Sequence, residues 1–188
     1  VWLLWIFSLV EHVKALAIWV GNRSRTQSEA RQSASRSIGI DIYEALKWSF
    51  LIMALCGCFE SFWHIGVLIY LLGSNLFSHF YYHVWHEPKA APLTHEAMKR
   101  RLSSFLLAFG FMITGYAYLF LAWCPAQIDW PGNVQDLPSA LFLSASNTFT
   151  LTYGEYGPTS NATRFLFVSQ VGYAFFFLVI IVARSLPS

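Results

Sequence analysis

Charged side chains are scarce in this sequence. Asp, Glu, Lys and Arg make up 12% of its 188 residues, whereas an ordinary soluble domain carries about 25%. The formal net charge of +2 is too small to indicate a nucleic-acid partner. Instead, 56% of the residues are hydrophobic and 18% are aromatic, and aromatic side chains favour the headgroup boundary of a bilayer. The composition therefore predicts an integral membrane protein that contacts the lipid bilayer directly.

Cysteine is too scarce to organise the fold. The three cysteines are Cys56, Cys58 and Cys124, and the Cys56-Gly-Cys58 spacing is too tight for an easy disulfide. No basic region precedes the first apolar stretch, which argues against a signal peptide. Because the chain begins at Val1 rather than Met, we expect that an N-terminal piece is missing.

Two apolar runs without charge are long enough to cross a bilayer, which takes about 20 residues. They cover residues 102–124 and 165–183. The polar segments around them predict their orientation. Residues 21–46 and 89–101 are rich in Arg and Lys, whereas residues 125–147 contain two aspartates and no Lys or Arg. The positive-inside rule therefore predicts a multi-pass protein of the cell membrane with 21–46 and 89–101 in the cytoplasm. We interpret 21–46 as a solvated linker.

The topology upstream is less determined. If both basic segments are cytoplasmic, residues 47–88 cross the membrane an even number of times. They form either a hairpin that breaks near residues 57–61 or a long helix along the inner leaflet. Glu60 and His64 lie one turn apart in this region, either as a functional pair or as a structural hydrogen bond between helices. Residues 1–20 form either a bundle-facing span or an interfacial helix.

A short helix is predicted between the two long apolar runs. Asp136 can cap its N-terminus and Pro138 suits its first turn, so we expect a helix over residues 137–149. This helix is too short to cross the membrane. The residues that follow it, "TLTYGEYGP", carry hydroxyl groups and glycines that suit the lining of a water-filled cavity. A span, a re-entrant helix, a polar loop and a second span together predict a pore lining.

The segment "TLTYGEYGP" resembles the selectivity filter of tetrameric potassium channels, whose short form is TVGYG. Residues of this chain match the Thr, the Val, the Tyr, the second Gly and the acidic residue that usually follows: Thr150, Leu151, Tyr153, Gly154 and Glu155. The order of helices also agrees over about residues 100–188. The resemblance implies an all-α pore domain over residues 102–188, assembled as a homotetramer, preceded by a membrane-associated helical region over residues 1–101.

The resemblance also implies an activity. It is passive conduction of monovalent cations, potassium above all, without a catalytic residue, a cofactor or a small-molecule substrate. The implied ion ligands are the main-chain oxygens of Thr150, Leu151, Thr152 and Tyr153, with the Thr150 hydroxyl at the innermost site. Thr152, however, occupies the place of the family's first glycine. A β-branched residue at positive φ stores roughly 1–3 kcal/mol of strain, so we expect a rearranged filter with a weakened preference for potassium over sodium.

Other residues of the pore region have expected places. Asp129, Asp136 and Glu155, repeated fourfold, make the outer mouth negative and concentrate cations. The C-terminal carbonyl end of the short helix points toward the cavity as a partial negative charge. Gly172 is either a hinge, as the resemblance implies, or a close contact between helices through a small residue. Gln170 is expected to face the cavity or a neighbouring subunit.

Two other functions stay open. His79, His83 and His86 in "HFYYHVWHE" lie on one helical face, a spacing that can bind a transition metal and indicates a membrane metalloenzyme. The interleaved Tyr and Trp residues also fit an aromatic belt at the membrane interface. The third hypothesis is a channel-shaped subunit that does not conduct, and Thr152 is the residue that favours it.

Overall fold

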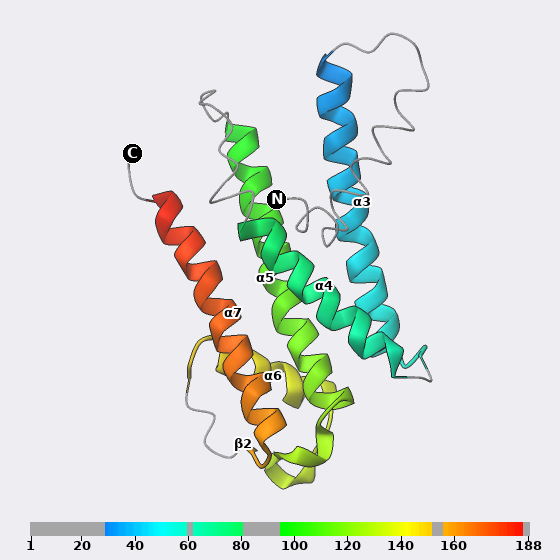
Figure 1. The fold of residues 1–188 in the computed structure, drawn as a ribbon, viewed down its shortest axis with the longest axis vertical. Coiled ribbons are helices and arrows are strands. Elements are labelled where there is room, and N and C mark those ends of the chain that lie inside the picture. The colour runs from blue at the N-terminus through cyan, green and yellow to red at the C-terminus, as the bar shows by residue number, and fades with distance from the viewer. Residues whose placement is uncertain (1–28, 60–61, 81–94, 152–155, 186–188) are drawn as a thin grey trace. The chain divides into compact units, whose positions relative to one another are not determined.

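Helices dominate the part of the chain that the structure, a computed structural model, describes: residues 29–59, 62–80, 95–151 and 156–185 (Figure 1). The chain divides into two compact units, residues 1–60 and 61–188. Each unit is considered by itself.

The described part of the first unit is helix α3, Glu29–Leu55, and the turn that follows it. The interpretation of residues 21–46 as a linker is wrong from Glu29 onward. The segment is polar, but it contains no proline and repeats the good helix formers Ala, Glu, Arg and Gln. Low hydrophobicity was therefore a poor guide to its backbone conformation. The cytoplasmic placement of the segment stays a prediction.

Helix α3 ends in a Schellman motif. Gly57 has a φ of 73°, its amide donates to the carbonyl of Ala54 over 3.1 Å, and the amide of Cys58 donates to the carbonyl of Met53 over 3.1 Å. Glycine suits this position because it has no Cβ to clash at positive φ. The predicted break near residues 57–61 is thus confirmed as a break between helices. Glu60 lies outside the described residues.

The second unit contains the two long apolar helices that the sequence predicts. They are α5, His95–Ala122, and α7, Asn161–Ser185. Within them, Leu102–Ala122 and Asn161–Val179 are long and apolar enough to cross a membrane. The other elements among the described residues of the unit are α4, Trp63–Phe80; the 3-10 turns Pro125–Gln127 and Pro131–Asn133; β1, Ile128–Asp129; α6, Leu137–Thr148; and β2, Gly157–Pro158.

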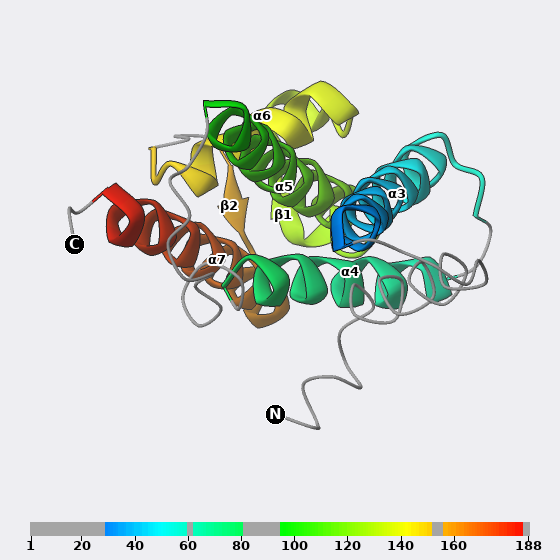
Figure 2. The ribbon, with the colours of Figure 1, turned by 90° about the horizontal axis from the view of Figure 1, so that it is seen from above.

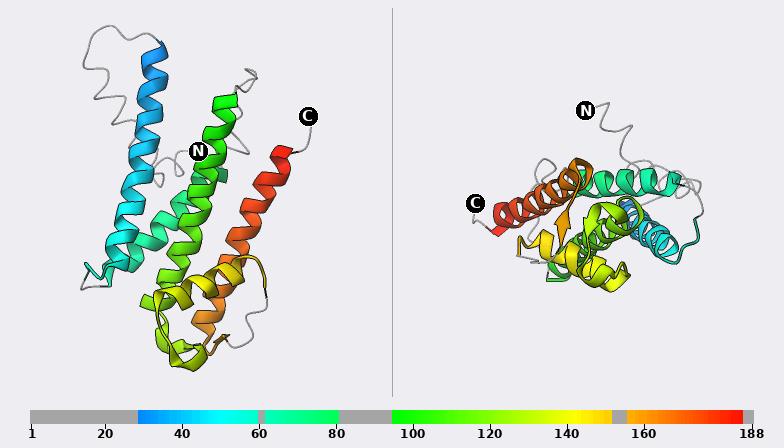
Figure 3. Two further views of the ribbon diagram at one scale, coloured as in Figure 1. Left: turned by 180° about the vertical axis from the view of Figure 1, so that it is seen from behind. Right: turned by 90° about the horizontal axis from the view of Figure 1, so that it is seen from below.

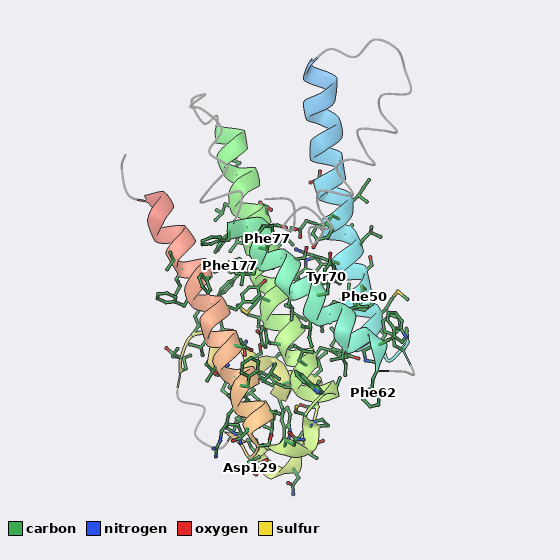
Figure 4. The ribbon with its side chains drawn as sticks, in the orientation of Figure 1. Phe50, Phe62, Tyr70, Phe77, Asp129 and Phe177 are labelled. Atoms are coloured by element: carbon green, nitrogen blue, oxygen red, sulfur yellow. The ribbon has the colours of Figure 1, made fainter. Side chains whose placement is uncertain are left out.

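Helices α5 and α7 lie side by side; α4 crosses α5 obliquely and also packs against α7 (Figures 1 and 2). Aromatic rings fill the contacts. The rings of Phe120 and Phe167 are 4.8 Å apart, and Phe177, labelled in Figure 4, is buried beside Tyr173 with a centroid distance of 5.3 Å. Because α4 packs on α5 and α7, the second unit begins at Ser61. A pore domain that begins at residue 102 stays a prediction.

The close approach of α4 to α5 depends on one glycine. A Cβ built on Gly115 would lie 3.1 Å from Cδ2 of Leu72, which is closer than carbon atoms normally pack. A small residue here lets the two helices come together, as is common between helices in membranes.

Candidate functional site

The N-terminus of α6 has the cap that the sequence predicts. Asp136 has extended backbone angles, and its Oδ1 accepts a 2.9 Å hydrogen bond from the amide of Ser139. Pro138 occupies the first turn, where its missing N–H costs nothing. Hydrogen bonds from Ser139, through its side chain first and then its main chain, hold the pKa of the Asp136 carboxyl below its ordinary value. The predicted short helix is confirmed, with its last residue at Thr148 rather than Phe149.

The C-terminus of α6 is a second Schellman motif, and it leads directly into the predicted filter. The amide of Leu151 donates to the carbonyl of Ser146 over 2.8 Å, and the amide of Thr150 donates to the carbonyl of Asn147 over 3.2 Å. These bonds engage two of the last carbonyls of the helix, which reduces the partial negative charge that this end presents.

Thr150 occupies the position that Gly57 holds in the first motif. Its φ is 54°, a value at which a β-branched side chain is strained by roughly 1–3 kcal/mol. Its hydroxyl donates to the carbonyl of Phe149 over 2.7 Å. Strain was predicted from the sequence at Thr152 and not at Thr150, because no glycine marks the cap. Thr152, Tyr153, Gly154 and Glu155 lie outside the described residues, so their filter roles stay predictions.

Gln170 does not have the place expected for it. It is fully buried within its own chain, against α6. Its Oε1 accepts a 2.9 Å hydrogen bond from Nδ2 of Asn147, and the same nitrogen donates to the carbonyl of Phe167 over 3.1 Å. The expectation that Gln170 faces a cavity or a neighbouring subunit is therefore wrong. An amide at this depth needs polar partners, and the last two turns of α6 supply them.

The other half of the Gln170 amide binds the hydroxyl groups of α6. Its Nε2 lies 2.7 Å from Oγ of Ser144, 2.7 Å from Oγ1 of Thr148 and 2.9 Å from the Ser144 carbonyl. The Ser144 hydroxyl in turn donates to the carbonyl of Ile113 on α5 over 2.6 Å. We call Ser144, Asn147, Thr148 and Gln170 the buried amide cluster. It joins α5, α6 and α7 at one level.

The loop that contains α6 is closed at its base. Strands β1 and β2 pair antiparallel, with Ile128 opposite Pro158 and Asp129 opposite Gly157. Beside them, the carbonyl of Gln127 accepts from the amide of Thr159 over 3.0 Å. The chain thus leaves and returns at the same end of the unit, where Asp129 is labelled in Figure 4. Between these points α6 lies across α5 and α7 (Figure 3).

Aromatic residues that the sequence did not mark continue the closure of the loop next to β1 and β2. The rings of Trp130 and Tyr156 meet edge to face at 5.9 Å, and the Tyr156 ring is 6.1 Å from that of Phe142 on α6. Nε1 of Trp130 donates to the carbonyl of Pro125 over 2.8 Å. Tyr156 is thereby fixed on one side of residues 152–155, and Leu151 is fixed by the cap on the other.

Apolar side chains are also exposed in the middle of α6 and just after its end. Phe149 is 57% exposed, Leu151 is 59% exposed and Phe142 is 58% exposed. Their exposure is large for residues that follow or flank a buried polar cluster. These side chains therefore have contact area left for lipid or for another protein surface.

The other candidate residues are only partly within the described chain. A Cβ on Gly172 would meet nothing within 4 Å, so no close helix contact is made there among the described residues, and the hinge stays a prediction. His79 is on α4, 5.6 Å from the Phe177 ring, whereas His83 and His86 lie outside the described residues. His64 is buried with its ring 5.7 Å from that of Tyr118.

Comparison of the chain with protein-family models, with curated proteins and with solved structures gives no match.

Proposed function

We propose that this chain is one subunit of a homotetrameric cation channel in a membrane, with residues 150–155 as the conducting loop. One observation carries the proposal. A capped helix too short to cross a bilayer lies between two helices that are long enough to do so, and it ends at the Thr-Leu-Thr-Tyr-Gly-Glu segment. The closed base of the loop, at β1 and β2, supports a segment that enters and returns on one side.

The physical chemistry of such a loop favours conduction. Main-chain carbonyl and amide groups that stop inside a bilayer must be satisfied by protein or by water. A ring of carbonyl oxygens that replaces the hydration shell of an ion uses these groups. A single chain supplies one loop and therefore a quarter of the ring. Three further copies would also cover the exposed side chains of Phe149 and Leu151.

Selectivity in this proposal is limited by threonine. Thr150 already adopts a strained positive φ at the entrance of the loop. Thr152 stands where the resembled family has a glycine, whose freedom at positive φ lets carbonyls line up. We therefore propose a cation channel that prefers potassium over sodium only weakly.

Reversal potentials measured on the purified full-length chain in planar bilayers test the proposal. With potassium on one side and sodium on the other, the wild-type chain should carry a cation current that reverses near zero. Thr152→Gly should shift the reversal toward the potassium equilibrium potential. Thr159→Gly is the matched control, because Thr159 is exposed and lies outside the conducting loop, and it should leave the reversal unchanged.

Two results would overturn the proposal. An anion current through the wild-type chain contradicts it directly. Silence of both the wild-type chain and Thr152→Gly favours the subunit that does not conduct.

A further inference from the structure

We propose that Gln170 is a positioning residue that couples α7 to the entrance of the conducting loop through the buried amide cluster. This inference rests on the proposed function for what the loop conducts, but the coupling itself is a property of the fold. It assigns to a buried glutamine a role in setting ion selectivity from behind the loop.

The buried amide cluster is closely hydrogen-bonded within the chain. Gln170 is fully buried, and Asn147 and Ser144 are 3% and 0% exposed. Both amide hydrogens of Asn147 have acceptors, Oε1 of Gln170 at 2.9 Å and the carbonyl of Phe167 at 3.1 Å. The Gln170 amide has oxygen acceptors at 2.7 Å on Ser144 and on Thr148. Buried polar networks that are satisfied in this way rigidify their surroundings.

The cluster lies directly before the entrance of the loop. Thr148 is the last residue of α6, and the Asn147 carbonyl accepts the amide of Thr150. Asn147, whose side chain Gln170 holds, therefore also supplies the carbonyl that caps Thr150 in its strained φ. A shift of α7 at Gln170 displaces the end of α6 and, through the cap, the first carbonyls of the loop.

Helix α7 has an unpacked glycine just beyond the cluster. Gly172 follows Gln170 by two residues, and open space surrounds the place of its missing side chain. Tyr173 anchors the next turn of α7 to α4, because its hydroxyl lies 2.9 Å from both the Leu72 carbonyl and Nδ2 of Asn75. Helix α7 is thus attached to α6 on one side of Gly172 and to α4 on the other.

Asn75 provides a matched control for Gln170. It is a buried amide, 1% exposed. Like Gln170 it donates both to a main-chain carbonyl, Ala108 at 3.1 Å, and to a side-chain hydroxyl, Tyr173 at 2.9 Å. These bonds join α4, α5 and α7. The described contacts of Asn75 do not reach α6. Leucine at either position removes a buried amide of this kind, but only Gln170→Leu disconnects the loop entrance.

Hydrogen–deuterium exchange on the full-length protein in lipid nanodiscs, read from peptides that cover residues 147–151, tests the coupling without any current. Gln170→Leu should speed exchange of these amides by about tenfold, since it leaves buried hydrogen-bonding groups unsatisfied. Asn75→Leu should leave the same peptides unchanged. Thr148→Val, which keeps the side-chain shape and removes one hydroxyl, should give a smaller increase and serves if Gln170→Leu fails to fold.

Bi-ionic reversal potentials supply the functional readout. Gln170→Leu should shift the ratio of potassium to sodium permeability, Gln170→Glu should restore part of the wild-type ratio because it keeps an acceptor for Asn147, and Asn75→Leu should not change it. If the wild-type chain conducts and Gln170→Leu matches Asn75→Leu in both measurements, the coupling is overturned and the channel stands. If the wild-type chain is silent while the exchange pattern holds, the coupling stands and the proposed function falls.

Discussion

Replacement of Thr150 by glycine should stabilise the second unit. Thr150 caps α6 at a φ of 54°, where a side chain with a Cβ costs roughly 1–2 kcal/mol. Glycine removes this strain but gives back about 0.5 kcal/mol through the larger entropy of the unfolded chain. The lost bond from the Thr150 hydroxyl is exposed and therefore contributes little. The expected net gain is about 1 kcal/mol, or about 3 °C in Tm for a chain of this size.

The substitution in the opposite direction, from glycine to threonine, can be made at the cap of α3. Gly57 caps α3 in the same motif at a φ of 73°, and a Cβ there would meet nothing within 4 Å. Gly57→Thr therefore tests the backbone angle without a steric clash. It should lower the stability of α3 by about 1–2 kcal/mol. Thr150→Gly should thus raise the stability, and Gly57→Thr should lower it.

Thermal unfolding in detergent, followed by circular dichroism at the helix band, measures both effects. A Thr150→Gly variant with an unchanged or lowered Tm, beside a Gly57→Thr variant with a lowered one, would refute the claim of stored strain at Thr150. If Thr150 also ligates ions, the more stable glycine variant should conduct less selectively. Such an exchange of stability for activity is common at functional sites.

Three further predictions concern the supports of the loop. Because the pKa of Asp136 is lowered in the folded protein, its cap stabilises the fold above the ordinary pKa of the carboxyl, and this contribution disappears as pH falls through the lowered pKa. Asp136→Asn should remove this pH dependence of the Tm. Identical plots of Tm against pH for the variant and the wild-type chain would contradict the prediction. Gly115→Ala should lower the free energy of unfolding by about 1–3 kcal/mol, because the new Cβ would lie 3.1 Å from Leu72. Gly66→Ala on α4, where the new Cβ has open space, should raise it by about 0.5–1 kcal/mol. Equal Tm values for the two variants would argue against the close contact at Gly115. Trp130→Phe keeps an aromatic ring but loses the bond to Pro125, so the free energy of unfolding should fall by about 1 kcal/mol and Tm should fall with it. An unchanged Tm would show that the ring contact suffices.

Local signals explain what could be predicted from the sequence. Residues 102–124 and 165–183 were recognisable as helices because each is an unbroken apolar run, and α6 because Asp136 and Pro138 mark its start. These features act within a few residues of the backbone that they determine. The start of α3 at Glu29 was missed because a polar segment without an apolar stripe was interpreted as a loop.

The site itself depends on contacts that the sequence does not display. Gln170 is 23 residues from Asn147 and 26 from Ser144, so its partners become evident only when α6 and α7 pack together. The left-handed conformation of Thr150 is imposed by the helix cap, and a threonine gives no warning of it. The pairing of Asp129 with Gly157 likewise requires the loop to close.

The two-residue ladder between β1 and β2 holds together the two ends of the segment 130–156. We expect that residues 130–156 can change in length without a change in where α5 ends and α7 begins, because the ladder joins the chain at these two points. The sequence of this segment is nevertheless constrained by the buried side chain of Gln170, which hydrogen-bonds to it. A segment grafted here from another protein would need an amide and two hydroxyl groups at the positions of Asn147, Ser144 and Thr148. Without them the buried amide of Gln170 would lose its hydrogen-bonding partners on α6.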